Sequence, residues 1–286
     1  MTGQQSSPVQ VRGEVLSVKR AGAYVLLTLL APGIAAQTRP GHFAALAVGD
    51  DPSATLLRRA FSIYRAEDRG VYGGTLEIVF AIQGAGTAWL ANRRAGDSVD
   101  VVAPLGRPFA LPRDPTTCVL VGGGYGAAPL LSLADALRGR GCRVHAVLGA
   151  ATEQRLFGAL EMRRRSDTLA LTTEDGSTGH RGRVTDVLPA VLTRTGSDVV
   201  YACGPMGMLA SVTDVAGQHG AVTQTAVEES MACGIGVCMT CVLPVVGDDG
   251  RTRMVRSCVD GPVFRGDRVR WADVGTVPVE TVGATP

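Results

Sequence analysis

The sequence has few aromatic residues and no marked excess of either charge. Aromatic residues make up 5% of the 286 positions, and 28 Lys and Arg residues nearly balance 26 Asp and Glu residues, for a formal net charge of +2. This balance excludes a disordered polyelectrolyte and offers no basic surface for nucleic acid or anionic lipid. Because hydrophobic residues still reach 45%, we expect two domains or more with cores of their own, working on small molecules.

Long hydrophobic runs are missing as well. The most apolar stretch, residues 23–36, is interrupted by Thr28, Pro32 and Gly33, and the first ten residues are polar. We therefore expect neither a membrane span nor a secretory signal. The seven cysteines are an odd number, which favours reduced thiols in the cytoplasm over a disulfide framework.

The signatures of several enzyme classes are also absent. The sequence contains no G-x-S-x-G nucleophile motif and no G-x-x-x-x-G-K-[ST] phosphate loop, so hydrolase and NTPase functions are not indicated. The four histidines, at positions 42, 145, 180 and 219, are scattered, and we expect each to be structural or solvated.

The first hundred residues predict an antiparallel barrel. Short runs rich in apolar and β-branched residues alternate with Gly, Pro and Asp, a spacing typical of closed or nearly closed barrels. A short helix is expected over 87–93, and the turn-rich segment 104–115 is interpreted as a linker. The expected strands are 9–16, 23–30, 42–48, 60–64, 75–82 and 98–102.

After the linker, strand and helix patterns alternate, which predicts βαβ units and a parallel sheet. From Ala221 the chain opens with a strand and then becomes loop-like, as in a small module organised by something other than a core. We therefore expect domains at 1–113, 114–220 and 221–286. The expected strands of the middle domain are 117–121, 144–148, 168–172 and 198–202, and its helices are 127–137, 153–163, 184–192 and 206–218.

Four cysteines are crowded into the C-terminal region. Cys233, Cys238 and Cys241 follow the spacing C-x4-C-x2-C, and Cys258 comes later; this run is typical of plant-type [2Fe-2S] ligands. Glycines between the first two cysteines let backbone amides approach the sulfurs closely. A zinc site is the alternative, although it would usually show two C-x2-C knuckles where this chain has one. The remaining thiols, Cys118 and Cys142 above all, are expected to be core residues.

Two anion-binding devices occur within the predicted barrel. Arg59 stands near Ser62 in one strand, where a guanidinium could clamp a diphosphate and a hydroxyl could reach a heteroaromatic ring. Gly84, Gly86 and Thr87 precede a helix, whose N-terminal amides favour anions. A solvent-facing arginine is the alternative for Arg59, but two such devices in one barrel suit the pyrophosphate of a dinucleotide.

Two glycine-rich turns mark the α/β region. The run 122–126, Gly-Gly-Gly-Tyr-Gly, joins the first strand to the first helix as a nucleotide-binding turn does, without matching the strict fingerprint. Cys203, Gly204 and Pro205 follow a later strand, at the sheet edge where open α/β sheets bind ligands. A glycine turn without a ligand and a thiol that merely packs remain the alternatives.

In this order, the motifs resemble the family of electron-transfer subunits of two-subunit, NAD-linked dihydroorotate dehydrogenases, within the ferredoxin-reductase superfamily. The resemblance spans nearly the whole chain. The segments that carry it are 59–63, 84–87, 122–126, 173–177, 201–206, 228–241 and 258–264.

The resemblance implies three cofactor sites. The family usually has Pro at the position of Ala60 and Lys at that of Gln83, so flavin affinity or potential is expected to differ. The chain shows no residue that decides between NAD and NADP. The implied residues are Arg59, Ala60, Phe61, Ser62, Val79, Phe80, Ala81, Gly86 and Thr87 for FAD; Gly122, Gly123, Gly124, Gly126, Cys203, Gly204 and Pro205 for NAD; and Cys233, Cys238, Cys241 and Cys258 for [2Fe-2S].

The resemblance also implies a function within a hetero-oligomer. A separate FMN-containing subunit would oxidise dihydroorotate, and electrons would pass through the cluster and FAD to NAD in pyrimidine synthesis, with no general acid or base in this chain. The glycine-rich loop 233–241 is the expected interface. Two alternatives are a related reductase subunit in a ferredoxin:NADP or sulfide-linked complex, and a non-enzymatic redox sensor or zinc-stabilised interaction module.

Overall fold

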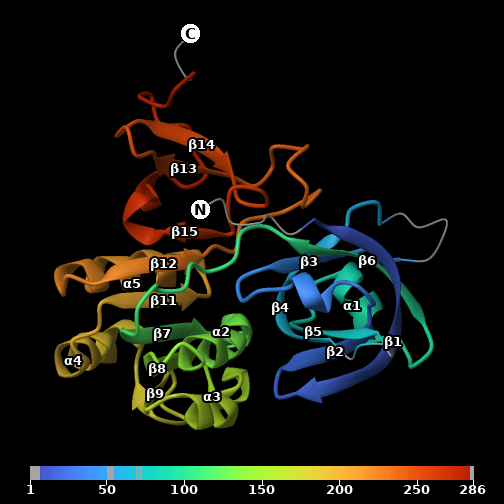
Figure 1. Cartoon of the computed structure of the whole chain (residues 1–286), viewed down its shortest axis with the longest axis horizontal. Helices are drawn as coiled ribbons and strands as arrows, with labels where there is room; N and C mark the ends of the chain where they lie inside the picture. The colour runs from blue at the N-terminus through green and yellow to red at the C-terminus, as the bar shows by residue number, and fades with distance from the viewer. Residues whose placement is uncertain (1–6, 50–54, 69, 71–72, 284–286) are drawn as a thin grey trace.

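An antiparallel barrel forms the N-terminal part of the chain, drawn in blue to cyan-green in Figure 1. The computed structural model describes residues 7–49, 55–68, 70 and 73–283, so the outer ends of the first and third expected domains lie outside the described residues. The barrel closes in the order β1-β2-β5-β4-β3-β6. Its strands are β1 (Val9–Ala21), β2 (Tyr24–Leu30), β3 (Phe43–Leu46), β4 (Arg59–Asp68), β5 (Gly74–Phe80) and β6 (Ser98–Leu105).

Every second side chain along the strands points into the barrel and fills its interior. Leu27 and Leu29 of β2 and Leu76 and Ile78 of β5 are buried in one cluster, because every second side chain of a strand points to the same face. The helix α1 (Ala85–Ala91) adds Leu90 to this core. The barrel expected from the sequence is thus confirmed.

A seven-stranded sheet follows, in the order β10-β9-β8-β7-β11-β12-β15. All neighbouring strands are parallel except β12 and β15, which pair in antiparallel fashion. The strands are β7 (Thr117–Gly123), β8 (Arg143–Ala150), β9 (Thr168–Thr173), β10 (His180–Arg181), β11 (Val199–Cys203), β12 (Val222–Ala226) and β15 (Val263–Arg265).

Helices cover both faces of this sheet, as expected for a doubly wound fold. On one face α2 (Ala128–Arg138) and α3 (Ala159–Arg165) share a core with Leu120 of β7, and on the other face α4 (Val184–Thr195) and α5 (Met206–Gln218) share a core with Val119. No helix among the described residues is both long and apolar enough to span a bilayer.

The expected helix over 153–163 is wrong in its first half. A short 3-10 turn covers Glu153–Arg155, and the α-helix begins only at Ala159. Gly158 separates the two with a φ of 69°, a left-handed conformation that interrupts a helix and favours glycine.

The C-terminal region contains more strand than the sequence indicated. A hairpin of β13 (Val242–Val246) and β14 (Thr252–Arg256) occupies part of the segment expected to be loop-like. β12, which begins just after the expected boundary at 221, pairs with β11 of the parallel sheet, and β15 extends that sheet further. The region is therefore anchored in the sheet of the middle part.

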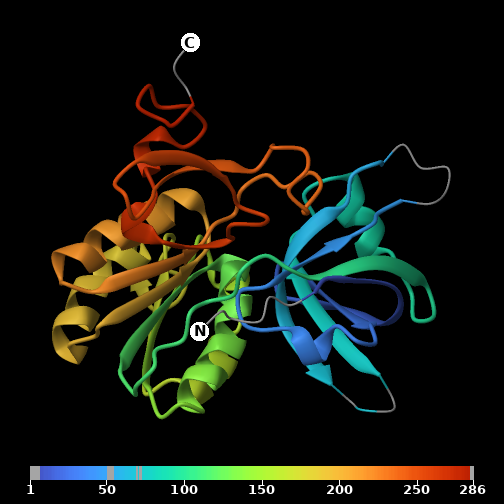
Figure 2. The ribbon, with the colours of Figure 1, turned by 45° about the horizontal axis from the view of Figure 1, so that its top comes forward.

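The cysteine-rich loop lies between this hairpin and the barrel. Figure 2 shows the orange segment reaching from the sheet toward the barrel. Cys241 and Cys258 are buried in one cluster with Phe43, Ala45 and Leu105 of β3 and β6. The two buried cysteines thus pack against the barrel, whereas Leu243 and Val269 of the same region pack with the sheet and its helices.

We expect Gly126→Ala to destabilise the chain and Gly217→Ala to stabilise it. A Cβ atom at Gly126 would lie 2.6 Å from the carbonyl oxygen of Cys203, a clash with fixed backbone, and overpacking of this kind costs about 1–3 kcal/mol. Gly217 lies within α5 with no atom within 4 Å of the added Cβ, where alanine gains about 0.5–1 kcal/mol. Thermal unfolding followed by circular dichroism measures both; equal unfolding temperatures for Gly126→Ala and the parent chain would contradict the tight packing.

Candidate functional site

Two cavities meet between the barrel and the sheet. The first, here the barrel cavity, has a volume of about 730 Å³ and is lined mainly by β4, β5 and residues 227–232. The second, the sheet cavity, has a volume of about 560 Å³ and lies at the carboxyl ends of β7, β8, β9 and β11. Gln83, Tyr125 and Glu228 line both cavities. These three residues form the shared wall.

The structure gathers the residues expected to bind flavin around the barrel cavity. Gly86 lies behind this surface, where a Cβ atom would be 3.0 Å from Nε of Arg59. The Thr87 hydroxyl accepts hydrogen bonds from the backbone amides of Gln83 (2.9 Å) and Gly84 (3.1 Å), which fixes the turn before α1. The expected residues that line the cavity are Arg59, Ala60, Phe61, Ser62, Val79, Phe80, Ala81 and Thr87.

The two neighbouring arginines have different partners. Arg58, which precedes β4, also lines the barrel cavity, but its guanidinium lies 2.5 Å from Oδ1 of Asp100 on β6 and donates to the Asp100 carbonyl at 3.2 Å. Arg59 instead donates to the carbonyl of Leu57 at 2.6 Å. In these contacts Arg58 has a carboxylate partner, whereas Arg59 has only a backbone carbonyl.

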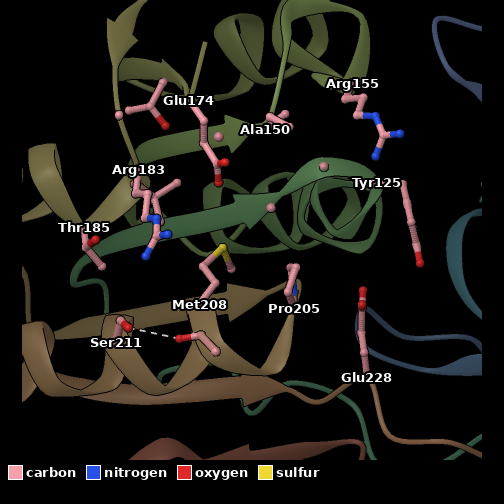
Figure 3. Close-up of a pocket in the computed structure, with 18 of the residues that line it drawn as sticks. Tyr125, Ala150, Arg155, Glu174, Arg183, Thr185, Pro205, Met208, Ser211 and Glu228 are labelled. Carbon is pink, nitrogen blue, oxygen red and sulfur yellow. Dashed lines mark hydrogen bonds between the residues drawn. The ribbon is translucent and has the colours of Figure 1, made fainter. Parts of the chain in front are cut away.

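The glycine turns shape the sheet cavity, which Figure 3 shows. Gly123, Gly124 and Pro205 line it. Behind them, an added Cβ at Gly122 would lie 2.8 Å from a Leu148 methyl, and one at Gly204 would lie 3.1 Å from Cα of Gly123. Gly122, Gly126 and Gly204 thus serve close backbone packing and do not line this cavity.

Cys203 is buried and lines neither cavity. Burial raises the pKa of its thiol well above the ordinary value, with a smaller contribution from the nearby Glu228 carboxyl. Of the two interpretations of this thiol, the structure favours packing.

Several charged residues of the sheet cavity were not identified from the sequence. Glu174, Arg183 and Arg155 line it, and in Figure 3 Glu174 and Arg183 lie at the end away from Tyr125 and Glu228. Glu174 and Glu228 each follow the carboxyl end of a parallel strand, where open sheets bind ligands. This position after a parallel strand is the sequence signal that could have identified Glu174 and Glu228.

Aromatic packing and electrostatics define the shared wall. The Tyr125 ring meets Tyr24 edge to face at 5.4 Å between ring centres, and the Tyr24 hydroxyl donates to the carbonyl of Arg155 at 2.7 Å. Burial raises the pKa of Tyr125 to about 12, and the Glu228 carboxyl adds to this while a hydrogen bond with Gln83 opposes it. Desolvation by the surrounding protein raises the pKa of Glu228 as well.

The first cysteine of the cluster run is surrounded by backbone donors. The amides of Ile235, Val237 and Cys238 point at Sγ of Cys233, at 3.5, 3.3 and 3.5 Å. Gly234 and Gly236 have φ angles of 72° and 84°, which turn these amides inward at no steric cost. Such amides stabilise a thiolate and the sulfurs of an iron-sulfur centre.

The four thiols lie as two pairs. Cys238 shares a hydrogen bond with Cys233, and Cys258 with Cys241. In the part of the chain that the structure describes, no three His, Cys, Asp or Glu side chains converge as around a single ion. Hydrogen bonds from Thr240 lower the pKa of Cys238 to about 6, whereas burial raises that of Cys258 to about 12.

Comparisons with known proteins agree with this geometry. Residues 228–270 match the family model described as the iron-sulfur cluster binding domain of dihydroorotate dehydrogenase B, and residues 120–214 match the oxidoreductase NAD-binding domain. Proteins named dihydroorotate dehydrogenase B (NAD(+)), electron transfer subunit, are similar to the chain over most of its length. The protein of Geobacillus thermodenitrificans is 39% identical, over 85% of this chain and 91% of its own. That of Listeria innocua is 35% identical, over 91% and 99%.

Solved structures show the same architecture. An NADH-dependent reduced ferredoxin-NADP oxidoreductase superposes with a TM-score of 0.78 and 29% identity, covering 95% of this chain and 92% of that one. A ferredoxin NADP+ reductase from Neisseria gonorrhoeae with bound FAD and NADP superposes with a TM-score of 0.58 over 74% of this chain and 92% of that one. At 16% identity it supports the fold alone.

We expect most bound iron and acid-labile sulfide to be lost when serine replaces any one of the four cysteines Cys233, Cys238, Cys241 and Cys258. Each of these sulfurs is an expected ligand. FAD is expected to remain largely bound, since none of the four cysteines lines the barrel cavity and β4 and β5 supply much of its lining. Cys142→Ser is the control, because this thiol is buried in the core beside α2. Iron and sulfide analysis after anaerobic purification gives the answer, and a full complement in any of the four variants would refute the ligand assignment.

Alanine in place of Arg59 is expected to weaken FAD binding by about 1.5–3 kcal/mol, the contribution of a charge-assisted hydrogen bond to phosphate. Arg58→Ala is expected to affect FAD much less, because that guanidinium is held by Asp100. Flavin retention after dialysis and fluorescence titration of the apoprotein measure both variants. Equal retention would count against Arg59 as the phosphate ligand.

Proposed function

The chain belongs to the family of dihydroorotate dehydrogenase B electron transfer subunits, and from this membership we propose that it carries electrons from an FMN-containing, dihydroorotate-oxidising subunit to NAD. The observation that supports this most is the contact between its three candidate sites. The two cavities share the wall of Gln83, Tyr125 and Glu228. Thr240, the neighbour of Cys241, lines the barrel cavity.

Each candidate site is assigned one cofactor. FAD, which can exchange a hydride with a nicotinamide and single electrons with a [2Fe-2S] cluster, has to stand between the other two. We assign it to the barrel cavity, with Arg59 at its phosphates and Ser62 at its ring. NAD is assigned to the sheet cavity, and the cluster to the four cysteines. The division 1–113, 114–220 and 221–286 follows these assignments, with the third region lending β12 and β15 to the sheet.

The partner is proposed to dock over the cysteine loop. Ile235, Val237 and Met239 are 56%, 74% and 52% exposed on this loop, and neighbouring apolar side chains on a surface favour protein association. Docking there would bring the partner's redox centre close to the cluster. The setting is pyrimidine synthesis in the cytoplasm, within a hetero-oligomer.

A reductase subunit of a ferredoxin:NADP complex is the second candidate. The observation in its favour is the superposition on the NADH-dependent reduced ferredoxin-NADP oxidoreductase over nearly the full length of both chains. Anaerobic purification with bound partners separates the two candidates: an FMN protein that oxidises dihydroorotate supports the first, and a partner without that activity supports the second.

On its own the chain is expected to be half an enzyme. It should oxidise NADH with an artificial electron acceptor, because both cavities lie within one chain, but it should not reduce NAD with dihydroorotate. Addition of the FMN-containing subunit should restore that reaction. Steady-state assays with and without the partner decide this, and dihydroorotate-dependent NAD reduction by the pure chain alone would overturn the division of labour.

A further inference from the structure

The proposed function leaves one proton unassigned. An iron-sulfur cluster delivers electrons one at a time and carries no proton, whereas a nicotinamide accepts a hydride, which is two electrons and one proton. One proton must therefore be supplied between the two for every hydride that leaves on NAD. In the opposite direction, one proton must be taken up for every pair of electrons that leaves through the cluster.

Glu228 is placed where this proton is needed. Among the described residues that line the two cavities, it provides the one carboxyl common to both. Glu229 lines only the barrel cavity and Glu174 only the sheet cavity. Figure 3 shows the Glu228 side chain directed toward the hydroxyl end of Tyr125, at the opposite end of the cavity from Glu174.

The backbone fixes this position. Glu228 follows β12 by two residues, and the amide of the intervening Val227 donates to the carbonyl of Pro262 at 2.9 Å. The residue is exposed and lines both cavities. Water can therefore reach the carboxyl, and ligands in both cavities would displace part of that water and disfavour the charged form further.

The titratable groups that face Glu228 keep their protons near neutral pH, so Glu228 is the group in this set that can exchange one. Tyr24 of β2, Tyr125 after β7 and Cys203 of β11 all sense its charge, and each has a pKa above its ordinary value. These three therefore stay protonated near neutral pH. Of the cations that line these cavities, Arg155 lowers the Tyr24 pKa; Arg183 lines the sheet cavity as well, and Arg58 and Arg59 line the barrel cavity. Desolvation by the surrounding protein raises the Glu228 pKa, so its protonated form persists to higher pH than for a free glutamate.

We propose that the Glu228 carboxyl supplies the proton that accompanies each electron pair from the cluster to NAD. Its O–H bond breaks, the proton and two electrons leave together as the hydride bound to NAD, and water then reprotonates the carboxylate. When NADH is the donor, the carboxylate takes up the proton left behind as two electrons depart through the cluster. The proposal rests on the proposed function and replaces the expectation that this chain uses no acid or base.

Glu228→Gln tests this, since glutamine has nearly the same shape and no transferable proton. Redox-triggered infrared difference spectra of the FAD-loaded chain should show the carbonyl stretch of a protonated carboxyl, shifted in D2O. Glu228→Gln should lose this signal and Glu229→Gln should keep it. Because the hydride brings its own proton, Glu228→Gln should slow reduction by NADH in a single turnover much less than it slows the onward transfer of electrons. Transfer onward to a one-electron acceptor should slow about 100-fold and lose its dependence on pH.

The outcomes separate the proposal from its premise. If NADH does not reduce the parent chain, the proposed function fails. If NADH reduces it but Glu228→Gln keeps the infrared signal and the parent rate and pH profile of onward transfer, the proton assignment is wrong. If Glu228→Gln does not retain FAD, Glu228→Asp takes its place: a carboxyl signal at a shifted frequency supports the assignment, and an unshifted signal refutes it.

Discussion

The backbone turns after β7 and β11 approach each other so closely that only glycine fits between them. A Cβ at Gly126 would meet the carbonyl of Cys203 at 2.6 Å, and one at Gly204 would meet Gly123 at 3.1 Å. This contact lies behind the lining of the sheet cavity and holds the turn that carries Tyr125, a residue of the wall shared with the barrel cavity. The separation between the two cavities therefore depends on a contact that contains no side chain.

The position of the cysteine loop in the C-terminal region depends on contacts with both the barrel and the sheet. Cys241 and Cys258 find their apolar neighbours in the barrel, and β12 and β15, which flank the longer segment that carries all four cysteines, belong to the seven-stranded sheet. Because packing and strand pairing come from different parts of the chain, the loop joins barrel and sheet. The position of the sulfurs relative to the barrel cavity is then fixed by the same contacts that hold the fold together.

Much of this arrangement could be predicted from the sequence, because it depends on local patterns: period-two strands, alternating strands and helices, and the spacing of cysteines. Elements that depend on a single residue's conformation or on distant partners could not. Gly158 breaks a helix that apolar periodicity favours. β13 contains Pro244 and β14 contains two arginines. The sequence of either segment, considered without the other, therefore does not indicate a strand. The proposed role of Glu228 depends on its position between two cavities, and no local sequence pattern reveals that position.

The pairing of β12 with β15 also bears on how the metal site can assemble. Ala226 and Val263 lie opposite each other in the sheet, so the segment that carries all four cysteines has its two ends held together. Closing a long loop costs conformational entropy that grows with its length, and the pairing of β12 with β15 brings the ends of this segment together without a metal-sulfur bond. Metal insertion can be a late, local step in the maturation of an already folded chain.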